Sequence, residues 1–172
     1  ISTLRILLNS ENKSNSSGFK DTSEKLGKYL MDHISICRFF SVPNSIKTKN
    51  IYKSNSELSG AGSFFIPFGT NLPKTESNNF LRGYGIWGAI NRLGIPEFLQ
   101  KDVNSSIGFL IAHGEVLPRK ENSVSLSNKT DSWGIPIPHI EFEWSENELE
   151  MAKHMDRTIR DSIIAADGKI KS

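Results

Sequence analysis

The sequence predicts an α+β fold, in which an antiparallel β-sheet is packed by helices. Several short segments rich in β-branched and aromatic residues follow one another along the chain, separated by short turns. One long segment near the C-terminus, residues 146–166, instead repeats its apolar residues at the period of an α-helix. Strands joined by short turns pair antiparallel, and a helix with one apolar stripe must bury that stripe against them.

The predicted strands combine β-branched or aromatic residues with flanking Gly, Pro, Asn and Ser. In the segment around His113, the alternation places this histidine on one face with Ile111 and Glu115, opposite Ala112 and Gly114. We therefore expect one buried and one exposed face for that strand. The predicted strands are residues 34–40, 62–69, 80–90, 106–117, 123–127 and 139–144.

Two helices are predicted. The first spans Ser2 to Ser10, where Ser2 or Thr3 can accept a hydrogen bond from a free amide of the first turn. The second begins after Ser145, which forms a capping box with Glu148. Its apolar stripe consists of Met151, Met155, Ile159 and Ile163, and Gly168 is a plausible stop.

A stiff corner is predicted where the letters DSWGIPIP cover residues 131–138. Pro136 and Pro138 have no amide hydrogen and so cannot occupy a central strand. Gly134 can adopt backbone angles that its bulky neighbours avoid. We expect Trp133 to anchor the corner by burying on the order of 200 Å².

The composition excludes several classes of protein. A net charge of +2 over 172 residues is too balanced for a nucleic-acid partner. No apolar run reaches the roughly 18 residues of a membrane-spanning helix, and Cys37 is the single cysteine. The four histidines show no metal-ligand spacing, so no metal site is expected. The chain opens on Ile1 without a signal-peptide pattern, and we expect it to be a piece of a longer protein or a processed product.

Residues 114–155 resemble the glucose–methanol–choline family of FAD-dependent oxidoreductases. They read as a strand ending in Leu-Pro, a turn, a Val-x-Leu strand, then Asp-x-Trp-Gly-Ile-Pro, a strand and a long helix. Further resemblances lie upstream, in the order that the family shows. These are STLRILLNS (residues 2–10), EKLGKYLMDH (residues 24–33) and FLRGYGIWG (residues 80–88), the last with Trp87 in place of a glutamine.

The resemblance implies a division of the chain and a reaction. Residues 1–33 would be a remnant of the FAD domain, and residues 34–172 the substrate domain, whose sheet roofs the flavin. In the full-length parent, FAD would take a hydride at N5 from a CH–OH group of an alcohol or sugar. The dinucleotide fingerprint Gly-x-Gly-x-x-Gly and the family's His-Glu-x-Gly-Thr motif do not occur in these 172 residues. We therefore assign no catalytic residue and do not expect the chain alone to hold FAD stably.

Three residues are candidates for contact with the cofactor. Ser2 and Thr3 would lie near the flavin adenosine by family position, although an ordinary helix cap explains them equally well. His33, in the Asp-His element, could contact the flavin or could pack and hydrogen-bond at the domain junction.

Three further residues are candidates for contact with the substrate. Tyr84 and Trp87 could form the aromatic wall of a sugar or alcohol pocket, or could simply be core residues of a strand. His113 could be a polar group of that pocket or a histidine on a solvent-facing strand. The expected partners are the alcohol or sugar and the remainder of the same enzyme.

A second class of function remains open at this point. A non-enzymatic β-sheet domain that binds a ligand or another protein would fit the same elements without the redox machinery. The coding sequence on either side discriminates between the two, because only the enzyme needs the dinucleotide fingerprint before this stretch and the histidine motif after it.

Overall fold

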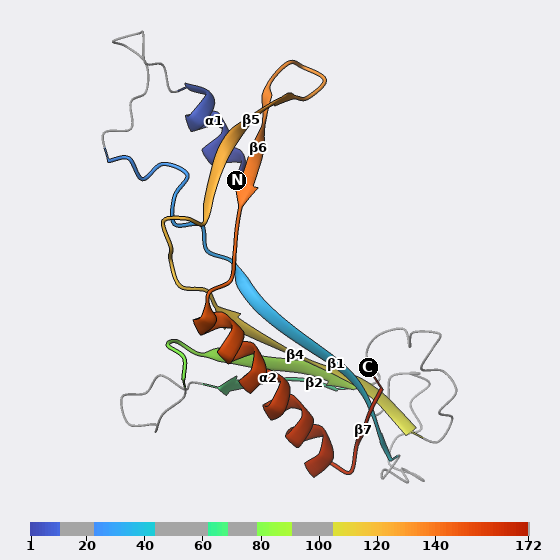
Figure 1. The fold of residues 1–172 in the computed structure, drawn as a ribbon. Helices are drawn as coiled ribbons and strands as arrows, with labels where there is room; N and C mark the ends of the chain where they lie inside the picture. The colour runs from blue at the N-terminus through green and yellow to red at the C-terminus, as the bar shows by residue number, and fades with distance from the viewer. Residues whose placement is uncertain (11–22, 44–61, 69–78, 91–104, 172) are drawn as a thin grey trace. The chain divides into compact units, whose positions relative to one another are not determined.

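The computed structural model describes residues 1–10, 23–43, 62–68, 79–90 and 105–171. It confirms the predicted α+β fold, in which an antiparallel sheet packs against a helix (Figure 1). The chain divides into two compact units, each made of two stretches: residues 1–32 with 116–145, and residues 33–115 with 146–172. The interpretation of residues 1–33 as part of an FAD domain stays a prediction.

The sheet of the second unit has the strand order β2-β3-β4-β1-β7 in the described part of the chain. All its pairings are antiparallel, and the longest, between β1 and β4, runs from His33 opposite Glu115 to Pro43 opposite Ser105. The predicted alternation holds at the C-terminal end of β4, where His113 and Glu115 are exposed and Ala112 and Gly114 are buried, but residues 107–110 are buried on both faces. The strands are β1 (His33–Pro43), β2 (Gly62–Phe68), β3 (Tyr84–Ile90), β4 (Ser105–Glu115) and β7 (Lys169–Ile170).

Strand β3 begins later than the predicted strand at residues 80–90. Phe80 is buried before the strand starts, and Arg82 has a φ of 71°, in the left-handed region that interrupts a β-strand. The segment from Phe80 to Gly83 is therefore a connection into β3.

One face of this sheet packs against helix α2 (Glu146–Ala165). The predicted apolar stripe is confirmed: Met151, Met155, Ile159 and Ile163 are all buried. Gly114 permits the close approach, since a Cβ there would overlap the side chains of Met151 and Met155. At the C-terminal end, Asp167 takes the left-handed conformation (φ 53°) and the Gly168 amide donates to the Ile163 carbonyl at 2.8 Å.

The first unit contains helix α1 (Ser2–Ser10), at the predicted bounds, and a hairpin of β5 (Ser123–Thr130) and β6 (Pro136–Glu141). Strand β6 begins and ends earlier than the predicted strand at residues 139–144. Pro136 and Pro138 both lie within it, which a strand paired on one side tolerates. Neither described helix is long and apolar enough to cross a membrane.

Polar groups hold the turn between β5 and β6. Asp131 Oδ1 accepts hydrogen bonds from the amides of Trp133 (2.9 Å) and Ile135 (3.1 Å), and Gly134 has a φ of 77°. Arg5 of α1 donates to Asp131 Oδ2 (2.7 Å) and to the carbonyls of Ile135 and Pro136. The hydrogen bond from Arg5 lowers the pKa of Asp131, so the carboxylate stays ionised to lower pH than usual.

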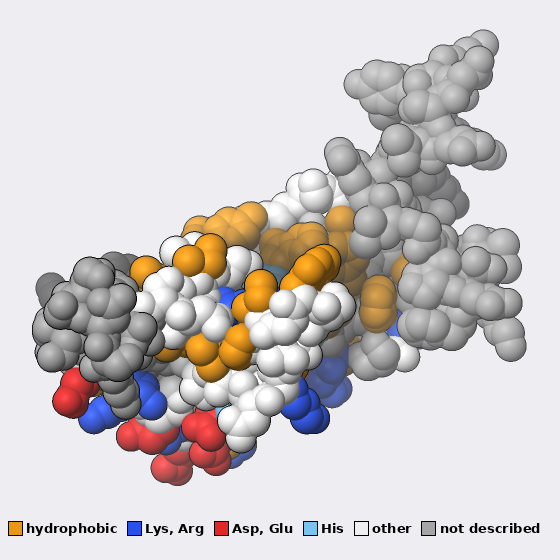
Figure 2. Space-filling view, turned by 90° about the horizontal axis from the view of Figure 1, so that it is seen from above, with side chains coloured by type: hydrophobic (Ala, Val, Ile, Leu, Met, Phe, Trp, Pro, Cys, Tyr) orange, Lys and Arg blue, Asp and Glu red, His pale blue; other side chains and the backbone are white. Residues whose placement is uncertain are grey.

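The prediction that Trp133 is a buried anchor is wrong. Its side chain is 83% exposed, while Asp131 and Arg5 fix the turn by hydrogen bonds instead of apolar packing. Other hydrophobic side chains are also exposed, including Ile140 and Trp144. The space-filling view shows patches of hydrophobic side chains apart from the area where most charged side chains gather (Figure 2).

Replacing Trp133 by alanine should change the free energy of unfolding by no more than about 0.5 kcal/mol, because an exposed side chain loses little on truncation. Val124→Ala, which truncates a buried residue of the same hairpin, is the matched comparison and should lower the denaturant midpoint more. A midpoint that falls further for Trp133→Ala than for Val124→Ala would show that the indole is packed.

Candidate functional site

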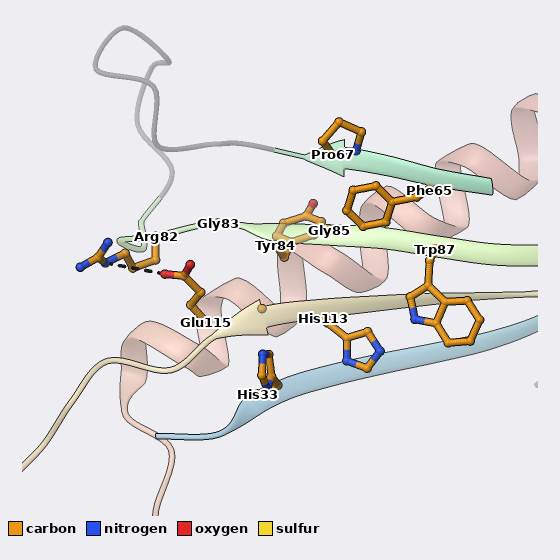
Figure 3. Close-up of a pocket in the computed structure, with 11 residues that line it drawn as sticks. His33, Phe65, Pro67, Arg82, Gly83, Tyr84, Gly85, Trp87, His113 and Glu115 are labelled. Atoms are coloured by element: carbon orange, nitrogen blue, oxygen red, sulfur yellow. Dashed lines mark ion pairs between the residues drawn. The ribbon is translucent and has the colours of Figure 1, made fainter. Parts of the chain in front are cut away.

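The face of the sheet opposite α2, called here the outer face, carries a pocket of about 540 Å³ (Figure 3). Neighbouring strands contribute to it through residues that share this face in the observed register. Side chains that line it include His33 of β1, Phe65 of β2, Trp87 of β3, and His113 and Glu115 of β4. Because these strands lie side by side, their side chains meet although they are far apart in sequence.

His113 lies at the centre of this arrangement. Its Nδ1 forms a hydrogen bond of 2.7 Å with Ser35 Oγ, the residue directly opposite it on β1. The Trp87 indole lies parallel to the imidazole within 5°, with ring centroids 6.3 Å apart. The imidazole is therefore held by a hydrogen bond and by an offset aromatic contact.

His33 lies beside His113 in the same pocket. The two rings are edge to face, with centroids 6.2 Å apart and planes at 87°. The structure thus brings a candidate for cofactor contact and a candidate for substrate contact to one site. Two imidazoles near each other provide hydrogen-bond donors and acceptors suited to a hydroxylated ligand.

The aromatic wall consists of Trp87 and Phe65. Trp87 is 38% exposed and packs edge to face against Phe109 at 5.0 Å, which fixes its plane. Phe65, directly opposite Trp87 on β2, is 65% exposed. Its ring lies over Gly85, where a Cβ would come within 2.7 Å of Phe65 Cε2. Gly85 therefore leaves room for the Phe65 ring above the strand.

Replacing Gly85 by alanine should turn the Phe65 ring away from β3 while changing the free energy of unfolding by less than about 1 kcal/mol. The obstructing atoms belong to the far end of a side chain that can rotate. Nuclear Overhauser contacts between Phe65 and residue 85 measure the ring position. Gly62→Ala, where a Cβ would meet nothing within 4 Å, is the control, and an unmoved Phe65 ring would contradict the expectation.

Tyr84 lies at the edge of the pocket, but its hydroxyl is directed to α2. It forms hydrogen bonds with His154 Nδ1 (2.8 Å) and Thr158 Oγ1 (2.9 Å) of that helix. Burial raises the pKa of Tyr84, and burial together with the nearby Arg157 charge lowers the pKa of His154. Both side chains are therefore held neutral at pH 7, on the face opposite Trp87 and His113.

Arg82 and Glu115 stand at the rim of the pocket, with Arg82 Nε 3.8 Å from Glu115 Oε2 (Figure 3). Both side chains are largely exposed, so the ion pair contributes little to stability. Sequence reasoning did not single out Phe65, Arg82 or Glu115 as site residues. The alternation in β4 already put Glu115 on the face of His113, whereas Phe65 requires the register of β2.

Ser2 and Thr3 lie exposed in the first turn of α1, in the first unit. The structure therefore assigns neither of them to the pocket of the second unit. No group of three or more His, Cys, Asp or Glu side chains suited to a metal ion occurs among the described residues.

The described residues do not provide a complete site for FAD. Helix α2 follows the capping residue Ser145 and not a glycine-rich turn out of a strand, and no Gly-x-Gly-x-x-Gly segment occurs in the 172 residues. A cradle of amides for the pyrophosphate is therefore lacking in this part of the chain. The outer face offers aromatic and imidazole side chains to a ligand, but no phosphate-binding turn.

Models of known protein families and a search of curated proteins yield no match to this chain. The class of protein that the structure defines is an α+β domain with a ligand-sized pocket on one face of an antiparallel sheet.

Proposed function

We propose that this chain is the substrate-binding portion of an FAD-dependent oxidoreductase that acts on CH–OH groups of alcohols or sugars. The observation that carries the proposal is the pocket on the outer face, in which Trp87, His113 and His33 lie together. His33 and Trp87 also lie in segments that resemble the glucose–methanol–choline family, EKLGKYLMDH and FLRGYGIWG. The pocket also lies on the sheet face that α2 leaves free, where a substrate under a roofing sheet would sit.

The pocket combines the two kinds of surface that a sugar or alcohol requires. The faces of Trp87 and Phe65 match the C–H groups of such a ligand, and burying them favours binding. The imidazoles of His113 and His33 can exchange hydrogen bonds with its hydroxyl groups. A few polar groups on an aromatic wall orient a ligand that the wall alone would hold loosely.

The contribution of this chain is binding and orientation. The cofactor, when bound in the full-length parent, supplies the acceptor for the hydride. Trp87 and Phe65 limit where the carbon skeleton lies, and His113 fixes the direction of a hydroxyl. Correct placement of a reacting carbon can lower the activation free energy by several kcal/mol, so a rigid pocket contributes to catalysis by orienting the substrate.

The alternative is a non-enzymatic domain that binds the same kind of ligand. It uses the same pocket, and it is favoured by the absence of the dinucleotide fingerprint and of the histidine motif from these 172 residues. Binding measurements on the chain test the pocket common to both alternatives, and flavin-dependent turnover of the longer protein separates them.

To test the pocket, the 172-residue chain is titrated with a panel of sugars, polyols and primary alcohols, and binding is monitored by NMR. We expect saturable binding that shifts the Trp87 indole signal and that weakens at least tenfold in Trp87→Ala. Trp144→Ala, which removes a partly exposed tryptophan of the first unit, should bind as the parent does. Failure of every ligand to bind, or equal affinity of Trp87→Ala, would contradict the proposal.

A further inference from the structure

We infer that Ser35 is a positioning residue, which holds the His113 imidazole so that its Nε2–H is presented to a hydroxyl group of the ligand. The inference rests on the proposed function and deepens it, because it names the group that recognises the hydroxyl and the residue that prepares it. Ser35 acts through His113: it does not itself line the pocket.

The geometry connects the two residues directly. Ser35 and His113 are cross-strand partners on β1 and β4, on the outer face of the sheet. Ser35 Oγ lies 2.7 Å from His113 Nδ1, a short hydrogen bond for these groups. Among the described residues, Nδ1 is the imidazole nitrogen with a hydrogen-bond partner, which leaves Nε2 for a ligand.

The hydrogen bond at Nδ1 determines which nitrogen carries the proton. A serine hydroxyl can rotate to donate to the lone pair of Nδ1, and the proton of the neutral ring then resides on Nε2. This is also the form that a free neutral imidazole prefers, so the hydroxyl reinforces an existing tendency. His113 thus becomes a fixed donor, which suits the oxygen of an alcohol or sugar.

Two aromatic neighbours restrain the ring further. Trp87 lies parallel to it and His33 meets it edge to face, so rotation about the Cβ–Cγ bond would disturb both contacts. A group whose orientation is set before the ligand arrives loses less conformational entropy on binding. Ser35 therefore contributes to affinity without touching the ligand.

The test uses the 172-residue chain with the variant Ser35→Ala. The ¹⁵N chemical shifts of the His113 ring report the tautomer, and titration with whichever sugar or alcohol binds the parent reports affinity. We expect the Nε2–H form in the parent, a mixture of tautomers in Ser35→Ala, and a roughly two- to tenfold loss of affinity, the amount that one hydrogen bond contributes. Ser35→Thr, which keeps the hydroxyl, should restore both.

Ser63→Ala is the matched control, since it makes the same substitution on β2, on the same face of the sheet and outside the pocket lining. Unchanged His113 ring shifts and unchanged affinity in Ser35→Ala would overturn the inference, as would an Nδ1–H form in the parent. If no ligand in the panel binds, the proposed function fails, and the ring shifts of the parent and of Ser35→Ala still decide whether Ser35 positions His113.

Discussion

Replacing Met155 by alanine is expected to lower the free energy of unfolding by about 2–5 kcal/mol. The Met155 side chain is 0% exposed and lies in the middle of the buried stripe of α2, against the position of Gly114 on β4. Truncation removes apolar contacts and leaves a cavity between the helix and the sheet, which neighbours fill only in part. Urea denaturation followed by circular dichroism measures the change.

Met31→Ala is the control for Met155→Ala, because it makes the same truncation at a side chain that is 59% exposed. We expect Met31→Ala to stay within about 0.5 kcal/mol of the parent. Equal midpoints for the two variants would mean that α2 is not packed on the sheet, and the argument that the outer face is the one left free for a ligand would lose its basis.

The second large effect concerns the reaction. The 172-residue chain, supplied with FAD and an artificial electron acceptor, is expected to reduce no dye with any sugar, polyol or primary alcohol. Loss of a positioned general base alone costs about 10² to 10⁴ in rate, and a flavin that is not anchored cannot keep its acceptor atom near the substrate carbon. The purified chain should likewise show no stoichiometric flavin absorption band, because no amide cradle for the pyrophosphate occurs in the described residues.

The comparison for this assay is the protein extended through both flanks of the coding sequence, which should turn over an alcohol or sugar with FAD. Variants His33→Ala and His113→Ala provide the decisive control on the short chain. Flavin-dependent turnover by the short chain that disappears in either variant would place the base in the outer-face pocket and contradict the assignment of this chain to binding.

Elements with strong periodicity were predictable from the sequence. The stripe from Met151 to Ile163 follows the helical period, and its residues are buried as predicted. The predicted bounds of α2 agree with the structure to within one residue. His113 was placed on the correct face because alternation along one strand needs no knowledge of its neighbours. A local pattern of this kind is enough to determine which face of an element a residue occupies.

Features that depend on distant partners were not predictable. The exposure of Trp133 is not predictable from its neighbours in sequence, because the turn is completed by hydrogen bonds from Arg5, 126 residues from Asp131. Ser35 and Phe65 enter the site through the registers of β1 with β4 and of β2 with β3. Composition and alternation do not fix a register between strands that long connections separate.

Tyr84 shows a different limit of sequence reasoning. Tyr84 and Trp87 are three residues apart on β3, so alternation puts them on opposite faces. Tyr84 faces α2, where His154 and Thr158 bond its hydroxyl. A buried tyrosine hydroxyl requires a partner, and these partners lie on a helix 70 residues or more along the chain.

We propose that this chain is the substrate-binding portion of a longer FAD-dependent oxidoreductase, and sequencing the coding region on both sides of it is the most direct test of that proposal. We expect a Gly-x-Gly-x-x-Gly segment before Ile1, placed between a strand and a helix, and a His-Glu-x-Gly-Thr segment after Ser172. A reading frame that contains neither segment on either side would contradict it.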